Sequence, residues 1–172
     1  MFLNSKEIKE IDCSHFNCLF ITSCISMFEN CDSLTKINFG MLDFPLVTNF
    51  ERMFCGCINL RELDVSKFKS SKCEYISQMF KNCKSITEIN MINWNLENLK
   101  DSWVFGNGIE DLFCGCKKLN NIKLNTNFNN KKLKNISVFN GIPKYGTFTW
   151  KKDSKNTLFL QYLPTTWEKY EE

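Results

Sequence analysis

Residues 27–39, Met-Phe-Glu-Asn-Cys-Asp-Ser-Leu-Thr-Lys-Ile-Asn-Phe, and residues 79–91, Met-Phe-Lys-Asn-Cys-Lys-Ser-Ile-Thr-Glu-Ile-Asn-Met, are two copies of one motif. The Met-Phe pair that opens the motif stands at positions 1, 27, 53 and 79, so the motif recurs every 26 residues. Variant pairs follow at Leu112 after 33 residues and at Val138 after another 26. Periods of this length are typical of repeats that stack on one another. The sequence therefore predicts one array of about five repeats, with an insertion near residues 99–109.

Every copy carries apolar residues at the same places after the Met-Phe pair. In the third copy these residues are Cys57, Leu60, Leu63 and Val65. Leu63 and Val65 alternate with polar neighbours, which is the pattern of a strand with one buried face. A short strand is therefore predicted in each repeat.

The segment before each Met-Phe pair has a different period. Val47, Phe50, Met53 and Cys57 are spaced by three or four residues, and residues 76–83 repeat this spacing. Such spacing is typical of one face of a short helix. A strand or helix this short is unstable alone in water, so the copies must stack to form a core. The predicted fold class is α/β, with short parallel strands on one face and short helices on the other.

The two quoted segments resemble the BspA-like leucine-rich repeats, a subclass with 26-residue repeats that occurs as a domain of unknown function in mycoplasma-type surface lipoproteins. Asp12-Cys-Ser-His-Phe16 and Asp64-Val-Ser-Lys-Phe68 are similar to the Asp-Leu-Ser-x-Phe turn of that repeat. The resemblance covers about residues 1–140. It implies a leucine-rich-repeat solenoid that serves as a binding scaffold, frequently as an adhesin.

Residues 141–172 leave the repeat register. Gly141-Ile-Pro143 interrupts the last copy, and Gly146-Thr-Phe-Thr-Trp150 alternates as a strand does. A stack of repeats needs a terminal cap over its last apolar layer. The segment is also similar to the tail that closes arrays of the BspA-like family. We therefore predict residues 1–140 as the repeat array and residues 141–172 as a C-terminal β cap.

The first expected strand, Ile8 to Cys13, has no upstream cap in the sequence. Met1, Phe2 and Leu3 would leave an apolar edge uncovered, and such edges tend to associate with other chains. Weak self-association through this uncapped N-terminal edge is therefore expected.

The composition is that of a folded chain, with 43% hydrophobic and 14% aromatic residues. The net charge of +3 is small, and no run of Lys or Arg follows one face, so no nucleic-acid partner is expected. No stretch approaches the ~20 apolar residues of a membrane span, and no signal peptide precedes the array. We expect a cytoplasmic protein, or a cell-surface protein if the chain is a fragment.

Ten cysteines raise two alternatives. Cys55-x-Cys57 and Cys114-x-Cys116 could hold zinc through paired thiolates, or disulfides could join neighbouring repeats. The repeat favours a third interpretation, a column of small buried thiols that behave as apolar side chains, with no metal and no cofactor. Cys18, in a corner, is expected to be the most reactive thiol. The column comprises Cys31, Cys57, Cys83 and Cys116.

The sequence contains no recognisable catalytic motif. His15 is the only histidine, and it lies in a corner between Ser14 and Phe16. No nucleophile elbow, phosphate-binding glycine loop or cluster of metal ligands accompanies it. We therefore expect no enzymatic activity.

Binding is the function that the predicted geometry favours. Strand side chains alternate, so the polar residues beside the buried column form two stripes across the sheet. The middle of this face is acidic, through Glu62, Asp64 and Glu88. Such a face suits a protein partner with a basic or mixed-charge patch. The first stripe is Glu10, Lys36, Glu62, Glu88 and Asn121, and the second is Asp12, Asn38, Asp64, Asn90 and Lys123.

The insertion offers a second binding candidate. Trp103 and Phe105 lie in it close to Gly106 and Gly108, and aromatic residues on loops are common interface anchors. The same side chains could instead pack onto the core. The predicted function is a non-enzymatic protein-interaction scaffold that binds through the strand face. The alternative is a surface adhesin, or a structural repeat fragment of a longer exported protein.

Overall fold

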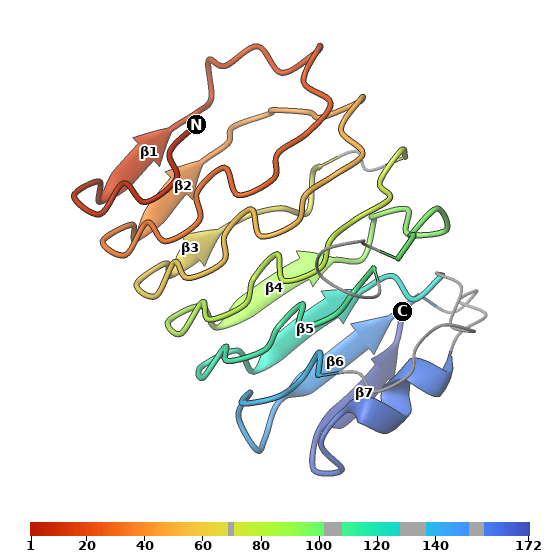
Figure 1. Cartoon of the computed structure of the whole chain (residues 1–172). Helices are drawn as coiled ribbons and strands as arrows, with labels where there is room; N and C mark the ends of the chain where they lie inside the picture. The colour runs from red at the N-terminus through yellow and green to blue at the C-terminus, as the bar shows by residue number, and fades with distance from the viewer. Residues whose placement is uncertain (69–70, 102–107, 128–136, 152–156) are drawn as a thin grey trace.

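The computed structural model describes residues 1–68, 71–101, 108–127, 137–151 and 157–172. In this part of the chain, short strands lie side by side along the length of the molecule (Figure 1). The strands are β1 Glu10–Asp12, β2 Lys36–Asn38, β3 Glu62–Leu63, β4 Glu88–Met91, β5 Asn121–Leu124, β6 Thr147–Trp150 and β7 Glu168–Glu171, and the 3₁₀ helix η2 covers Thr157–Tyr162.

The paired strands are all parallel and keep the register of the sequence repeat. Ile11 lies opposite Ile37, and Ile37 opposite Leu63, so residues 26 apart are neighbours. Between β4 and β5 the offset becomes 33, with Ile89 opposite Ile122. The predicted parallel strands are therefore confirmed.

The prediction of helices in residues 47–57 and 76–83 is wrong. The structure has consecutive β-turns in both segments. Arg52 and Gln78 have φ angles of 55° and 59°, in the left-handed region that an α-helix does not use. A positive φ at the third residue of a turn is typical of a type II turn. The described residues contain no α-helix, so the fold is a set of parallel sheets linked by turns.

Backbone hydrogen bonds explain why turns replace helices. The N–H of Met53 donates to Phe50 within a turn, whereas the N–H of the next residue, Phe54, donates to Met79 in the following repeat at 2.9 Å. Alternate N–H groups therefore bind the neighbouring repeat. A helix would direct each N–H to the carbonyl four residues earlier and leave the repeats unlinked on this side. Apolar spacings of three and four arise here from successive turns.

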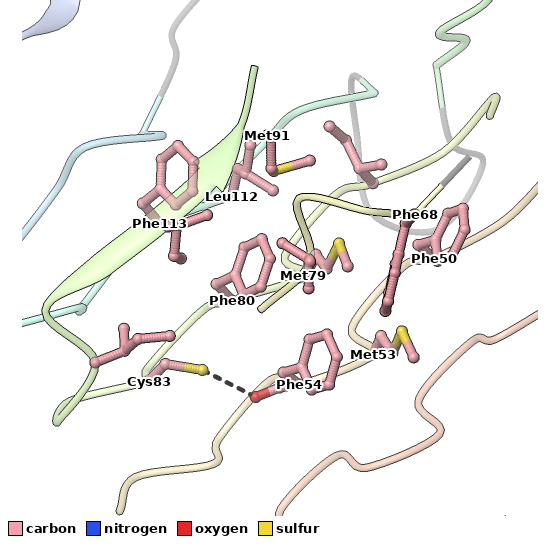
Figure 2. Packing of buried hydrophobic residues seen from close by; sticks show 14 of the residues in the cluster. Phe50, Met53, Phe54, Phe68, Met79, Phe80, Cys83, Met91, Leu112 and Phe113 are labelled. Atoms are coloured by element: carbon pink, nitrogen blue, oxygen red, sulfur yellow. Dashed lines mark hydrogen bonds between the residues drawn. The ribbon is translucent and has the colours of Figure 1, made fainter. Parts of the chain in front are cut away.

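Stacked phenylalanine rings form the centre of the core. Phe28, Phe54, Phe80 and Phe113 are fully buried, and each ring stacks on the next at 5.6 to 5.9 Å. Figure 2 shows the rings of Phe54, Phe80 and Phe113. A second aromatic cluster packs beside this column, where Trp94 donates its indole N–H to the carbonyl of Val65 at 2.9 Å. The members of this cluster are Phe39, Phe44, Phe50, Phe68 and Trp94.

The buried thiol column expected from the sequence is present. The thiol of Cys83 donates to the carbonyl of Phe54 at 3.1 Å, as the dashed line in Figure 2 shows. The other column cysteines make the same contact with a Phe carbonyl of the preceding repeat, at 2.9 to 3.0 Å. Burial raises the pKa of Cys116 to about 12, which keeps this thiol protonated and able to donate. All ten cysteines are free.

The Cys83→Ala variant is expected to lose about 1–2 kcal/mol of unfolding free energy, because it removes a buried sulfur atom and its hydrogen bond. Cys83→Ser is expected to lose less, since a hydroxyl can donate to the same carbonyl and Ser5 fills this position in the first repeat. Urea denaturation of both variants measures the difference. Equal losses would show that the thiol hydrogen bond contributes no stability.

The C-terminal segment continues the stack. Strand β6 lies where the sequence predicted a strand, and both β6 and β7 add to the sheet in parallel. Trp167, which is buried, donates its indole N–H to the carbonyl of Pro143 at 3.0 Å. Lys169 of β7 lies opposite the buried Phe148, so a charged residue occupies the apolar column at this edge. Such a residue discourages the addition of another strand.

Candidate interaction face

The first stripe lies along consecutive strands. Glu10, Lys36 and Glu62 are neighbours across β1, β2 and β3, and Glu88 lies opposite Asn121 across β4 and β5. The first four side chains are exposed, whereas Asn121 is half-buried and accepts a hydrogen bond from the Thr147 hydroxyl at 3.0 Å. The exposed part of this stripe therefore extends from β1 to β4.

The second stripe has a structural role that the sequence analysis missed. The side-chain oxygens of Asp12, Asn38 and Asp64 each accept the backbone N–H two residues later, all at 2.9 Å, and Asn90 does the same at 3.2 Å. These Asx turns lead the chain from the strand into the corner. Lys123, the last member, is half-buried and 4.0 Å from a carboxylate oxygen of Glu172. This stripe therefore shapes the corners as well as facing solvent.

A hollow of about 600 Å³ lies on the strand face at the junction of two sheets. Strands β1, β2 and β3 form one sheet, and β4 to β7 form the other. Residues of both stripes meet in the hollow, together with Arg61 and Thr87, which precede β3 and β4 and which the sequence analysis did not single out. The hollow is lined by Lys36, Ile37, Asn38, Arg61, Glu62, Leu63, Asp64, Ser66, Thr87, Glu88 and Asn90.

Two of the acidic groups in the hollow are already engaged. Lys36 Nζ lies 2.6 Å from Glu62 Oε2, and this hydrogen bond raises the pKa of Lys36. Hydrogen bonds from the hydroxyl and N–H of Ser66 lower the pKa of Asp64. Glu88, in contrast, has no ion pair within the described residues. It is therefore the carboxylate best placed to receive a cation from outside.

Trp103 and Phe105 lie in residues 102–107, outside the described part of the chain. The insertion therefore adds no described side chain to the site.

A charge network in the turn segments was also missed. Arg52 pairs with Glu29, whose side chain is 8% exposed, and Lys81 Nζ lies 2.6 Å from Asp111 Oδ2. Burial alone would raise the pKa of Asp111, but the hydrogen bonds from Lys81 and Ser137 outweigh it and the pKa is lowered. The feature of the sequence that could have revealed these ion pairs is the 26-residue period, because it places the opposite charges in neighbouring repeats. The network links repeats and lies away from the hollow.

The cysteines are almost all buried. Nine are buried and only Cys114 is half-buried. Cys18, which was expected to be the most reactive thiol, is buried, and burial raises the pKa of its thiol. Within the described residues, no three His, Cys, Asp or Glu side chains lie together in a way that could hold a metal ion. The described part of the chain also has no helix long and apolar enough to cross a lipid bilayer.

Comparison with known families agrees with the repeat pattern. The model of a family described as "Mycoplasma protein of unknown function, DUF285" matches residues 1–108, the region that contains β1 to β4. Members of the BspA-like family carry this domain, so the resemblance seen in the sequence is confirmed at that level. Comparisons with curated proteins and with solved structures gave no match. Because the match covers more than half of its length, the chain belongs to the DUF285 family.

Proposed function

We propose that the chain is a leucine-rich-repeat solenoid that acts as a non-enzymatic scaffold and binds a protein partner through its strand face. The observation that supports this most directly is the hollow at the junction of the two sheets. It gathers exposed charged and amide groups from three strands into one concave surface. Concave surfaces built from successive repeats are the binding surfaces of many repeat proteins.

The charges of the hollow indicate the chemistry of the partner. Glu88 is exposed and has no ion pair within the described residues, and Glu62 is 68% exposed beside Lys36. A lysine or arginine side chain that entered the hollow could pair with Glu88 and compete with Lys36 for Glu62. Arg61, on the same wall, could pair with a carboxylate of the partner. A protein surface of mixed charge with a central basic residue fits these groups.

Reversing two charges, Glu62→Lys and Glu88→Lys together, is expected to weaken partner binding by about tenfold or more. Asp64 is left unchanged because its carboxylate holds an Asx turn, and its replacement would also disturb the corner. The partner is first captured from extract by chemical cross-linking and then purified. Calorimetric titration gives its Kd for the native chain and for the variant.

Glu97→Lys is the matched control, because Glu97 is exposed and lies outside the hollow. This variant should bind the partner as the native chain does. The Lys36–Glu62 pair is exposed, and exposed ion pairs contribute little to stability, so the double variant should remain folded, which urea denaturation checks. A double variant that is folded and binds with an unchanged Kd would exclude the hollow as the binding site.

A further inference from the structure

Two further hollows adjoin the hollow at the junction of the sheets. The middle hollow has a volume of about 360 Å³ and shares Ile37, Asn38 and Asp64 with the hollow at the junction. The corner hollow has a volume of about 350 Å³ and shares Met41 and Leu42 with the middle hollow. The three hollows therefore follow one another from the strand face to the corners after β1 and β2.

The lining changes from charged to apolar along this series of hollows. The hollow at the junction contains the exposed carboxylates of Glu62 and Glu88. The middle hollow contains Lys67, whose Nζ lies 3.7 Å from Met41 Sδ. A second basic group would be repelled there, so a ligand that follows the hollows carries its positive charge at the β3–β4 end. The apolar residues that line the corner hollow are Phe16, Cys18, Leu19, Met41 and Leu42.

Met41, which lines both the middle and the corner hollow, is 81% exposed. Its corner is in contact with the repeats on both sides. A Cβ built on Gly40 would lie 2.8 Å from Ser14 Cβ of the preceding repeat, and Lys67 of the following repeat contacts Met41 itself. The exposure of Met41 is therefore not caused by the lack of a neighbouring repeat. The equivalent residues of the first, third and fourth repeats are the polar His15, Lys67 and Asn93.

We propose that the partner is bound through an extended segment, which places a lysine or arginine in the hollow at the junction and apolar side chains over Met41 and in the corner hollow. This inference rests on the proposed function, in which Glu62 and Glu88 receive the basic residue. Each hollow has the volume of a small-ligand pocket, which accommodates side chains and not a folded domain. Successive pockets of this kind select the side chains of extended peptides. Methionine suits the apolar end, because its flexible thioether adapts to different apolar groups.

A phage library of random peptides of about nine residues, selected on the full chain, tests the proposal. An extended peptide of that length spans ~30 Å. The selected peptides should share one lysine or arginine and, apart from it in sequence, at least two apolar residues. Fluorescence anisotropy of a labelled peptide should show binding weakened about tenfold by Glu62→Lys with Glu88→Lys, and about fivefold by Met41→Ser. Met41 is exposed, so Met41→Ser should leave the midpoint of urea denaturation unchanged.

Changes in the peptide separate the two ends of the site. Serine in place of the apolar residues of the peptide should weaken binding about fivefold on the native chain and not at all on Met41→Ser, because that contact is already lost. Replacing the basic residue of the peptide should weaken binding equally on both chains. Tyr145→Ser is the matched control, because Tyr145 is 64% exposed and lies outside the three hollows, so this variant should bind as the native chain does.

The inference is overturned if no selected peptide binds at millimolar concentration, if the peptides lack the basic and apolar pattern, or if Met41→Ser leaves their affinity unchanged. Weakening by the double charge reversal alone would restrict the contact to the hollow at the junction and leave the scaffold proposal standing. The scaffold proposal fails separately, if the partner captured from extract binds the folded double variant with an unchanged Kd.

Discussion

Replacing Phe54 by alanine is expected to lower the free energy of unfolding by about 3–5 kcal/mol. Phe54 is fully buried, and its ring stacks on Phe28 at 5.6 Å and on Phe80 at 5.7 Å. In a stack of repeats, each layer is stabilised mainly by its two neighbours. Loss of a ring in the middle of the column therefore weakens two interfaces at once. Urea denaturation followed by circular dichroism measures the change.

Two other Phe→Ala variants test whether the loss of stability in Phe54→Ala comes from the stacked column of rings. Phe20 is 83% exposed, so Phe20→Ala should change stability by less than about 0.5 kcal/mol. Phe2 is half-buried, and within the described residues its ring stacks only on Phe28, at 5.3 Å, so Phe2→Ala should fall between the other two variants. A loss at Phe54 no larger than the loss at Phe2 would mean that stacking along the column does not stabilise the fold.

The register of the sheets could be predicted because it follows from the period alone. Residues at a spacing of 26 must be neighbours if equal repeats stack, and Ile11, Ile37 and Leu63 are such neighbours. The alternation within each strand then determined which side chains face out. For this reason the first stripe was located correctly from β1 to β4.

The turns could not be distinguished from helices by apolar spacing. Met53 and Cys57 are four residues apart and both fully buried, as they would be on a helix face. The difference lies in where the backbone N–H groups are directed, and that depends on the neighbouring repeat. Positive φ angles at Arg52 and Gln78 carry no sequence signal, because neither residue type favours them.

The hollow could not be predicted because it lies where one sheet ends, at β3, and the next begins, at β4. Residues 62–64 and 88–90 occupy equivalent places in the repeat, yet β3 and β4 belong to different sheets. Asx turns at Asp64 and Asn90 are likewise visible only once the backbone is placed, although Asp and Asn are the residue types that form them. The sequence therefore predicted the face but not the place on it where groups converge.

The third residue after the Met of each repeat has a left-handed backbone conformation, and this position is occupied by asparagine or glycine. Asn30, Gly56 and Asn82 have φ angles of 56°, 76° and 62°. Asparagine and glycine adopt such angles more readily than any other residues. Within this column of equivalent residues the side chain of Asn30 leans over Gly56, and a Cβ built on Gly56 would overlap its Oδ1. A side chain at position 56 must therefore tolerate the left-handed backbone and also displace the amide of Asn30.

Gly56→Val is expected to lower the free energy of unfolding by about 2–4 kcal/mol, because a β-branched residue is strained at this φ and its side chain must displace Asn30. Gly56→Asn is expected to cost much less. Asn30 already packs under Asn4 in the same column and donates from Nδ2 to Asn4 Oδ1 at 3.1 Å, so an asparagine at position 56 has a precedent. Denaturation curves of the two variants make the comparison. Equal losses for valine and asparagine would show that space, rather than the left-handed backbone, determines the residue at this position.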